Sequence, residues 1–235
     1  MPLKASYLFM RFQRPRRLKN KSMGNIERPK DWWGAPENAL AWISQNQKRE
    51  SSGDLKTNTT IQSAGMVFEE VAKRIENFKK ICEVGAGDGR LIGMLSQIYL
   101  KKKFFSVDIN KELSRYVGEK YPRVKTFVAD IIDMKKIKKD HFDLVFTYQV
   151  LQHIPPEEIM NALNELLRIT KDTLLLWEGI GRVDGYQNGA KVHNAHNGSF
   201  VHYIDQLIKC EEVIIPQNNN LKLERQRLYV IRKRK

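Results

Sequence analysis

The sequence predicts an α/β protein built on a doubly wound, mostly parallel sheet. Two observations carry this prediction. From residue 80 onward, short apolar runs alternate with segments of helical periodicity. The first apolar run leads directly into "EVGAGDGR", a glycine-rich turn between a strand and a helix. In doubly wound sheets, ligands bind at the carboxyl ends of the strands, which is where this turn lies.

The elements follow one another along the chain in the order that such a sheet requires. A helix is predicted from Pro36, residues 46–60 are expected to form a polar loop, and a second helix follows over 61–78. Strands are then predicted at 80–84, 104–109, 125–129, 143–148 and 172–178, and the intervening helices at 91–99, 111–121 and 155–169. The last helix has two prolines and two acids in its predicted first turn. Residues 212–217 and 227–233 are expected to close the sheet as an antiparallel pair.

Length and charge divide the chain into three predicted parts. With 235 residues, 41% of them hydrophobic and 29% charged, it is expected to form one globular domain with an extra arm. The predicted parts are a basic arm at 1–30, a helical and loop cap at 31–60 and the main domain at 61–235. The arm contains nine basic residues and one acid, and so holds eight of the fourteen net positive charges.

Three interpretations of the basic arm remain open. It can grip nucleic acid or another anionic surface. It can be an organellar presequence, since it is rich in arginine and poor in acids. It can also be a translated extension upstream of a start at Met23. Apart from these alternatives, we expect a cytoplasmic protein, because the sequence has two cysteines, no apolar stretch of about 20 residues and no signal-peptide core.

The glycine-rich turn argues against a dinucleotide. A nicotinamide-binding loop has the spacing G-x-G-x-x-G, whereas here Gly85, Gly87 and Gly89 alternate and Arg90 stands at the place of the third glycine. Glu83 precedes the turn, where it would repel a pyrophosphate. An acid at this position suits a ligand with a cationic ammonium group and no phosphate.

"EVGAGDGR" resembles the first motif of the class I S-adenosylmethionine-dependent methyltransferases, and the resemblance extends through the later elements to the end of the chain. It implies a Rossmann-like sheet of seven strands with an antiparallel last strand, and S-adenosylmethionine as cofactor. Asp108 would accept hydrogen bonds from the ribose hydroxyls, Asp130 would meet the adenine amino group, and the residues around Tyr148 would lie beside the sulfonium. The predicted cofactor-binding residues are Glu83, Gly85, Ala86, Gly87, Gly89, Asp108, Ile109, Asp130, Ile131, Tyr148 and Gln149.

The acceptor is less sharply indicated than the cofactor. "VLQHIPPEE" is typical of the subgroup that acts on metabolites, sugars, lipids and some tRNA bases, and the motifs of amino-directed nucleic-acid methylases are missing. We therefore expect methyl transfer to an oxygen or nitrogen of a small polar or glycan-type acceptor. An RNA methyltransferase that grips its substrate with the basic arm is the alternative. A cofactor-binding regulator without catalysis is a third and weaker one.

Candidate catalytic residues follow the fourth and fifth strands. His202, followed by Tyr203, is the first choice for the proton acceptor, and His153 and Glu178 are alternatives. A metal site formed by His202 and two nearby histidines is weaker because glycines leave its geometry free, so no resident metal is expected. The tryptophans at 32, 33 and 42 either cap the core or line the pocket.

Overall fold

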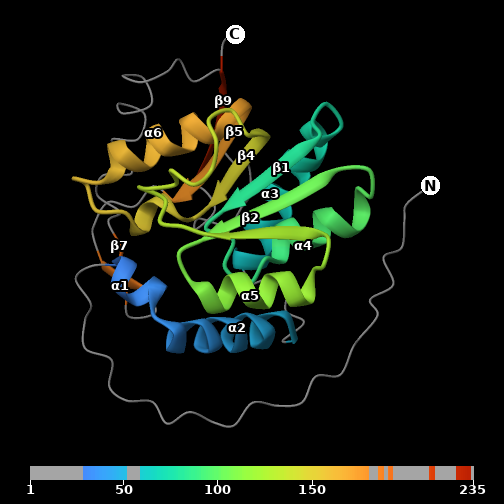
Figure 1. Cartoon of the computed structure of the whole chain (residues 1–235). Coiled ribbons are helices and arrows are strands. Elements are labelled where there is room, and N and C mark those ends of the chain that lie inside the picture. The colour runs from blue at the N-terminus through green and yellow to red at the C-terminus, as the bar shows by residue number, and fades with distance from the viewer. Residues whose placement is uncertain are drawn as a thin grey trace.

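The main sheet is mostly parallel, as the sequence predicts. In this computed structural model, the described residues are 29–51, 59–179, 185–187, 190–192, 212–214 and 226–233. Within them the sheet order is β3-β2-β1-β4-β5-β9-β8 (Figure 1). The strands are β1 (Lys80–Val84), β2 (Lys103–Asp108), β3 (Val124–Val128), β4 (Phe142–Tyr148), β5 (Thr170–Gly179), β8 (Glu212–Ile214) and β9 (Gln226–Arg232).

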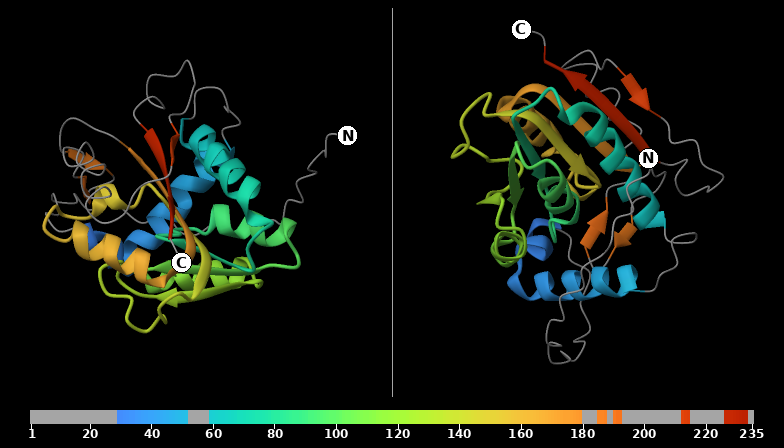
Figure 2. Two further views of the ribbon diagram at one scale, coloured as in Figure 1. Left: turned by 90° about the horizontal axis from the view of Figure 1, so that it is seen from above. Right: turned by 90° about the vertical axis from the view of Figure 1, so that its right-hand side faces the viewer.

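The chain first winds outward from the centre of this sheet and then returns. It runs from β1 to β2 and β3 at one edge, and then crosses back to β4 on the other side of β1. These strands and β5 are parallel, whereas β9 is antiparallel to both β5 and β8. The right-hand view of Figure 2 shows β8 and β9 side by side at the far edge. The predicted doubly wound, mostly parallel sheet with an antiparallel last strand is confirmed.

Helices cover both faces of the sheet. They are α1 (Pro29–Gly34), α2 (Pro36–Ser51), α3 (Thr59–Ile75), α4 (Arg90–Ile98), α5 (Lys111–Lys120), the short 3-10 helix η1 (Leu151–His153) and α6 (Ile159–Ile169). Apolar side chains of α3, α4 and α5 share one core cluster with the sheet, and those of α6 share a second cluster with its other face. Among the described residues, no helix is long and apolar enough to cross a lipid bilayer.

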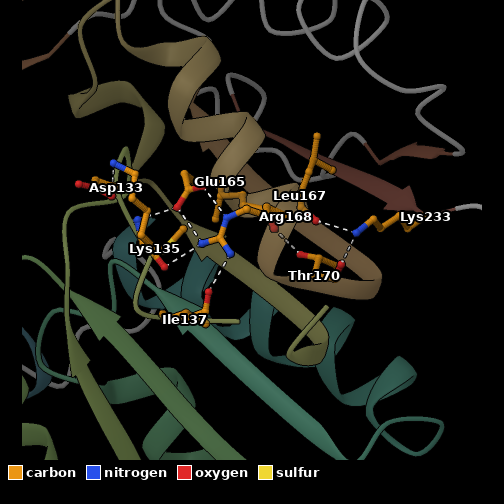
Figure 3. Close-up of polar contacts among 10 residues, drawn as sticks. Asp133, Lys135, Ile137, Glu165, Leu167, Arg168, Thr170 and Lys233 are labelled. Atoms are coloured by element: carbon orange, nitrogen blue, oxygen red, sulfur yellow. Dashed lines mark hydrogen bonds and ion pairs between the residues drawn. The ribbon is translucent and has the colours of Figure 1, made fainter. Parts of the chain in front are cut away.

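Arg168 of α6 fixes the loop that joins β3 to β4. Its guanidinium pairs with Glu165 and donates hydrogen bonds to the carbonyls of Met134 (2.8 Å) and Ile137 (2.7 Å), as Figure 3 shows in part. The amide of Met134 in turn donates to Glu165 at 2.6 Å. This loop follows directly after β3, so the network also holds the segment that begins at Asp130.

The two N-terminal helices are tied to the sheet at the end of β2. The side-chain amide of Asn110 donates to the carbonyls of Trp33 (2.8 Å) and Ala35 (2.9 Å), at the junction of α1 and α2. Its carbonyl oxygen accepts from the amides of Glu112 (2.9 Å) and Leu113 (3.2 Å), and so caps α5. Since Asn110 is 1% exposed, one buried side chain joins the N-terminal helices to the sheet edge. Figure 1 shows α2 lying along α5 as a result.

Three predicted boundaries need correction. The polar loop predicted for 46–60 is shorter, because α2 continues to Ser51 and α3 starts at Thr59; the run "NQKRE" contains good helix formers, whose propensity outweighs its polarity. The helix predicted for 155–169 begins at Ile159 instead. Consecutive prolines at 155 and 156 disfavour helical geometry at the first of them. Third, a hairpin of two short strands, β6 (Gly185–Gln187) and β7 (Ala190–Val192), follows β5, where no strand is predicted.

We expect the tie made by Asn110 to be visible in the stability of the protein. Asn110→Ala removes the cap of α5 and both bonds to the N-terminal helices, so the free energy of unfolding should fall by about 2 kcal/mol or more. Asn110→Ser retains a capping oxygen, but its side chain does not reach the two carbonyls. Its free energy of unfolding should therefore be about 1 kcal/mol higher than that of the alanine variant. Denaturant unfolding measures both values. Equal stability of the alanine variant and the unchanged protein would contradict the assignment.

Candidate cofactor-binding and active site

A pocket opens at the carboxyl ends of β1, β2 and β4, where the strand order reverses. The N-terminal helices and η1 form its walls. The predicted site residues that line it are Glu83, Gly85, Ala86, Gly87, Asp108, Ile109, Asp130, Ile131, Tyr148, Gln149 and His153. Gly89 lies behind the pocket as the N-cap of α4, and Glu178 is not among the lining residues. His202, Tyr203 and the other histidines of the proposed metal alternative lie outside the described residues.

The glycines of the loop between β1 and α4 leave room for protein side chains. Gly85 and Gly87 have φ angles of +72° and +56°, a left-handed conformation that other residues rarely adopt. A Cβ at Gly85 would lie 2.4 Å from Cγ2 of Val150, and one at Gly87 would lie 2.9 Å from Nε1 of Trp42. Val150, after β4, and Trp42 of α2 therefore approach the backbone of this loop closely.

Glu83 is a buried carboxylate at the end of β1. It is 3% exposed, and its Oε2 accepts a hydrogen bond from the amide of Ile92 at 3.1 Å. Burial raises the pKa of Glu83 well above its usual value, and the nearby carboxylates of Asp88 and Asp108 raise it further, whereas Ile92 and Arg90 act in the opposite direction. A cationic group in the pocket would therefore favour the ionised form of Glu83.

Asp108 occupies the corresponding position at the end of β2. Its two oxygens accept from the amides of Gly87 (2.8 Å) and Asn110 (2.9 Å). Burial raises the pKa of Asp108 to about 6, although these amides and that of Ile109 lower it. A carboxylate has about four acceptor positions, so these amides leave acceptor capacity at the pocket.

Asp130 and Ile131 follow β3 on the third side of the pocket. The carboxylate of Asp130 accepts from the amide of Ile132 (3.2 Å), and its carbonyl accepts from the amide of Asp133 (2.9 Å), which makes a tight turn. Ile131 is 7% exposed and lines the pocket together with the neighbouring Ala129. The turn thus offers one carboxylate beside an apolar surface.

Aromatic side chains close the pocket from the N-terminal side. The sequence leaves open whether these tryptophans cap the core or line a pocket, and the structure places Trp33 and Trp42 in its wall. Their rings meet edge to face with centroids 5.2 Å apart, and Trp33 meets the ring of His153 at 4.8 Å. The side chain of Trp32 lies outside what the structure describes. The wall therefore joins α1, α2 and η1, segments distant in the sequence.

Glu178 is buried and does not line the pocket. It is fully buried near the end of β5, and its carboxylate accepts hydrogen bonds from the hydroxyl of Thr147 (2.9 Å) and the amides of Val150 (3.3 Å) and Leu151 (3.1 Å). Burial raises the pKa of Glu178 to about 7, while these hydrogen bonds lower it. This environment differs from that of a base that meets an acceptor directly, because the pocket does not reach it.

Further pocket residues are absent from the sequence-based prediction. Gln152, Glu157 and Glu158 line the pocket after β4. The signal that could have indicated them is the run "QHIPPEE". In the sequence-based prediction, this motif indicates only the class of acceptor and no residues of the pocket. β7 lies beside α1 and η1, so the hairpin after β5 is close to the same wall.

Comparisons with known proteins agree with this geometry. Residues 81–173 match a family described as "Methyltransferase domain". No curated protein matches the sequence significantly. A TehB-like SAM-dependent methyltransferase from Corynebacterium glutamicum is 17% identical, with 85% of this chain and 100% of that chain covered and a TM-score of 0.64. Magnesium protoporphyrin IX methyltransferase from Synechocystis PCC 6803, solved with bound SAH, is 14% identical, with 87% and 98% covered and a TM-score of 0.61.

A third similar structure, a SAM-dependent methyltransferase from Aquifex aeolicus, is 16% identical, with 70% of this chain and 88% of that chain covered and a TM-score of 0.53. At these identities the solved structures show a shared fold. The match of residues 81–173 covers the glycine loop, β2, β3, β4 and α6, which carry most of the pocket. Residues 81–173 are therefore similar to a methyltransferase domain, and the chain shares the fold of solved S-adenosylmethionine-dependent methyltransferases.

Proposed function

We propose that this pocket binds S-adenosylmethionine and directs its methyl group to an oxygen or nitrogen of a small polar or glycan-type acceptor. The observation that carries this proposal is the buried carboxylate of Asp108. It stands at the end of β2, it is held by the amides of Gly87 and Asn110, and it keeps acceptor capacity at the pocket. A vicinal diol such as a ribose supplies the two donors that such a carboxylate can accept.

The donor groups around the pocket fit the other parts of the cofactor. Asp130 and Ile131 offer a carboxylate beside an apolar surface, which suits an adenine ring with its amino group. Glu83 offers a buried carboxyl group, whose ionised form the ammonium group of the methionine moiety would favour, and the loop at Gly85–Gly87 would hold the same moiety. Tyr148 and Gln149 would lie beside the sulfonium.

The bound cofactor supplies an activated methyl group on a good leaving group, so the chain mainly has to orient the acceptor. The wall of Trp33, Trp42 and His153 is the proposed acceptor side. A hydroxyl or ammonium acceptor must also lose a proton, for which His202 with Tyr203, or alternatively His153, is the proposed base. His153 lines the pocket, which supports its candidacy.

Charge at the pocket favours a neutral or cationic acceptor over a polyanion. In the described part of the chain, six carboxylates line it and Arg90 is the one lysine or arginine that does. The carboxylates belong to Glu83, Asp88, Asp108, Asp130, Glu157 and Glu158. The phosphates of an RNA acceptor would be repelled by the ionised carboxylates among them.

RNA methylation remains the second candidate function because of the basic residues in the first thirty positions. In that case residues 1–30 would supply the phosphate contacts that the pocket rim does not offer, with 31–60 as a cap and 61–235 as the catalytic domain. A regulator that binds the cofactor without catalysis is the weakest alternative. We propose the cytoplasm as the location, or an organelle if residues 1–22 are a presequence.

For the proposed function, the first prediction concerns cofactor binding and its pH dependence. Asp108→Asn should weaken S-adenosylmethionine binding by about 1.5–3 kcal/mol, because charge-assisted hydrogen bonds to the ribose are lost. In the unchanged protein, affinity should fall as the pH is lowered through about 6, where the Asp108 carboxyl becomes protonated. Calorimetry at several pH values measures both effects. A variant that binds as tightly as the original would exclude Asp108 from the cofactor site.

The second prediction separates the two histidines. If His202 is the base, His202→Ala should slow methyl transfer by roughly a hundred-fold and leave cofactor affinity unchanged. The loss should shrink at high pH, where the acceptor needs less help with its proton. His153→Ala is the matched comparison, measured with the same fraction of cell extract as the source of the acceptor. If only His153→Ala is slow, the role passes to His153.

The third prediction concerns the acceptor. With labelled S-adenosylmethionine and fractionated cell extract, label should enter small metabolites or glycans, and its transfer should change little between about 50 and 200 mM salt. With RNA as acceptor, the transfer of label would instead fall at least about tenfold over that range, because phosphate contacts weaken steeply with salt.

A chain that begins at Met23 should bind the cofactor normally. If it binds cofactor but loses activity, the RNA function is favoured.

A further inference from the structure

We propose that Glu178 is a positioning residue, which holds the turn after β4 in the conformation that shapes the methionine end of the pocket. This inference goes beyond the proposed function because it assigns a role to a residue outside the pocket. It rests on the proposed function only for the identity of the ligand. Its basis is a set of contacts made by a carboxylate that does not touch the pocket.

The turn after β4 has an unusual backbone. Gln149 has a φ angle of +56°, which residues other than glycine seldom adopt, and its amide donates to the carbonyl of Trp177 at 2.8 Å. η1 follows at once, and its N-cap residue, Val150, provides no side-chain hydrogen bond. The first amides of a helical turn have no partner within the turn. This segment therefore needs an acceptor from elsewhere in the chain.

Glu178 supplies that acceptor from the neighbouring strand. Oε1 accepts from the amide of Val150 (3.3 Å) and from the hydroxyl of Thr147 (2.9 Å), and Oε2 accepts from the amide of Leu151 (3.1 Å). Thr147 and Glu178 are both 0% exposed. A carboxylate without contact to water is retained only where hydrogen bonds compensate its desolvation, and here the compensation comes from the turn itself.

The turn transmits this support to the pocket. Val150 fills the space above Gly85, where a Cβ would lie 2.4 Å from its Cγ2. At the other end of η1, His153 packs edge to face against Trp33. A change in the turn would therefore move both the wall at the glycine loop and the aromatic wall. The carboxylates of Asp108 and Asp130, on β2 and after β3, are held by other partners and would stay in place.

This separation gives a test with two ligands. Glu178→Gln keeps the side-chain shape but replaces one acceptor oxygen by a donor, which faces amides that also donate. S-adenosylhomocysteine, which reaches the methionine end, should bind about tenfold more weakly to this variant, whereas adenosine, which does not, should bind within about twofold of the unchanged protein. The amides of Val150 and Leu151 should also exchange faster with solvent, while those of Glu112 and Leu113, capped by Asn110, should not.

A second pair of variants covers the case in which Glu178→Gln does not fold. Thr147→Val removes the hydroxyl that orients Oε1, so this variant should show the same loss of S-adenosylhomocysteine binding and the same faster amide exchange, but to a smaller extent. Thr147→Ser retains the hydroxyl and should behave like the unchanged protein. Unchanged exchange of the two amides together with unchanged S-adenosylhomocysteine binding would overturn the positioning role. If the unchanged protein binds neither ligand, the proposed function fails, and amide exchange alone still decides whether Glu178 holds the turn.

Discussion

Val150 and Trp42 reach the loop between β1 and α4 only because Gly85 and Gly87 carry no Cβ and adopt left-handed backbone angles. The rest of the site is arranged around this contact. It brings the turn after β4 and the N-terminal helix α2 against the same short segment, and it leaves Glu83 and Asp108 on either side of the loop. A side chain at either glycine would push one of these walls away.

Two buried polar side chains then hold the walls in position, in different ways. Asn110 donates to the carbonyls at the α1–α2 junction and accepts from the amides of α5. Glu178 accepts from Thr147 and from the turn after β4. Each satisfies backbone groups that regular secondary structure leaves unpaired, which is why polar residues are retained at these buried positions.

Much of the fold could be predicted because the pattern is local. Strands such as Lys80–Val84 are short apolar runs, and the helix at 111–120 has its capping residue, Asn110, directly before it. Errors occurred where the local signal was mixed. The polar run at 46–51 is helical, and the prolines at 155 and 156 stand before α6 instead of inside it.

The sequence by itself determined the alternation of strands and helices, the glycine loop and the carboxylates at the strand ends, because each depends on residues adjacent in the chain. Only the tertiary structure decided that Trp33 meets His153, and that Glu178 supports a turn 27 residues before it and lies outside the pocket. These are contacts between segments far apart in sequence, set by strand register and helix packing. The register and the packing bring these segments together, and no local motif encodes which distant residues will meet.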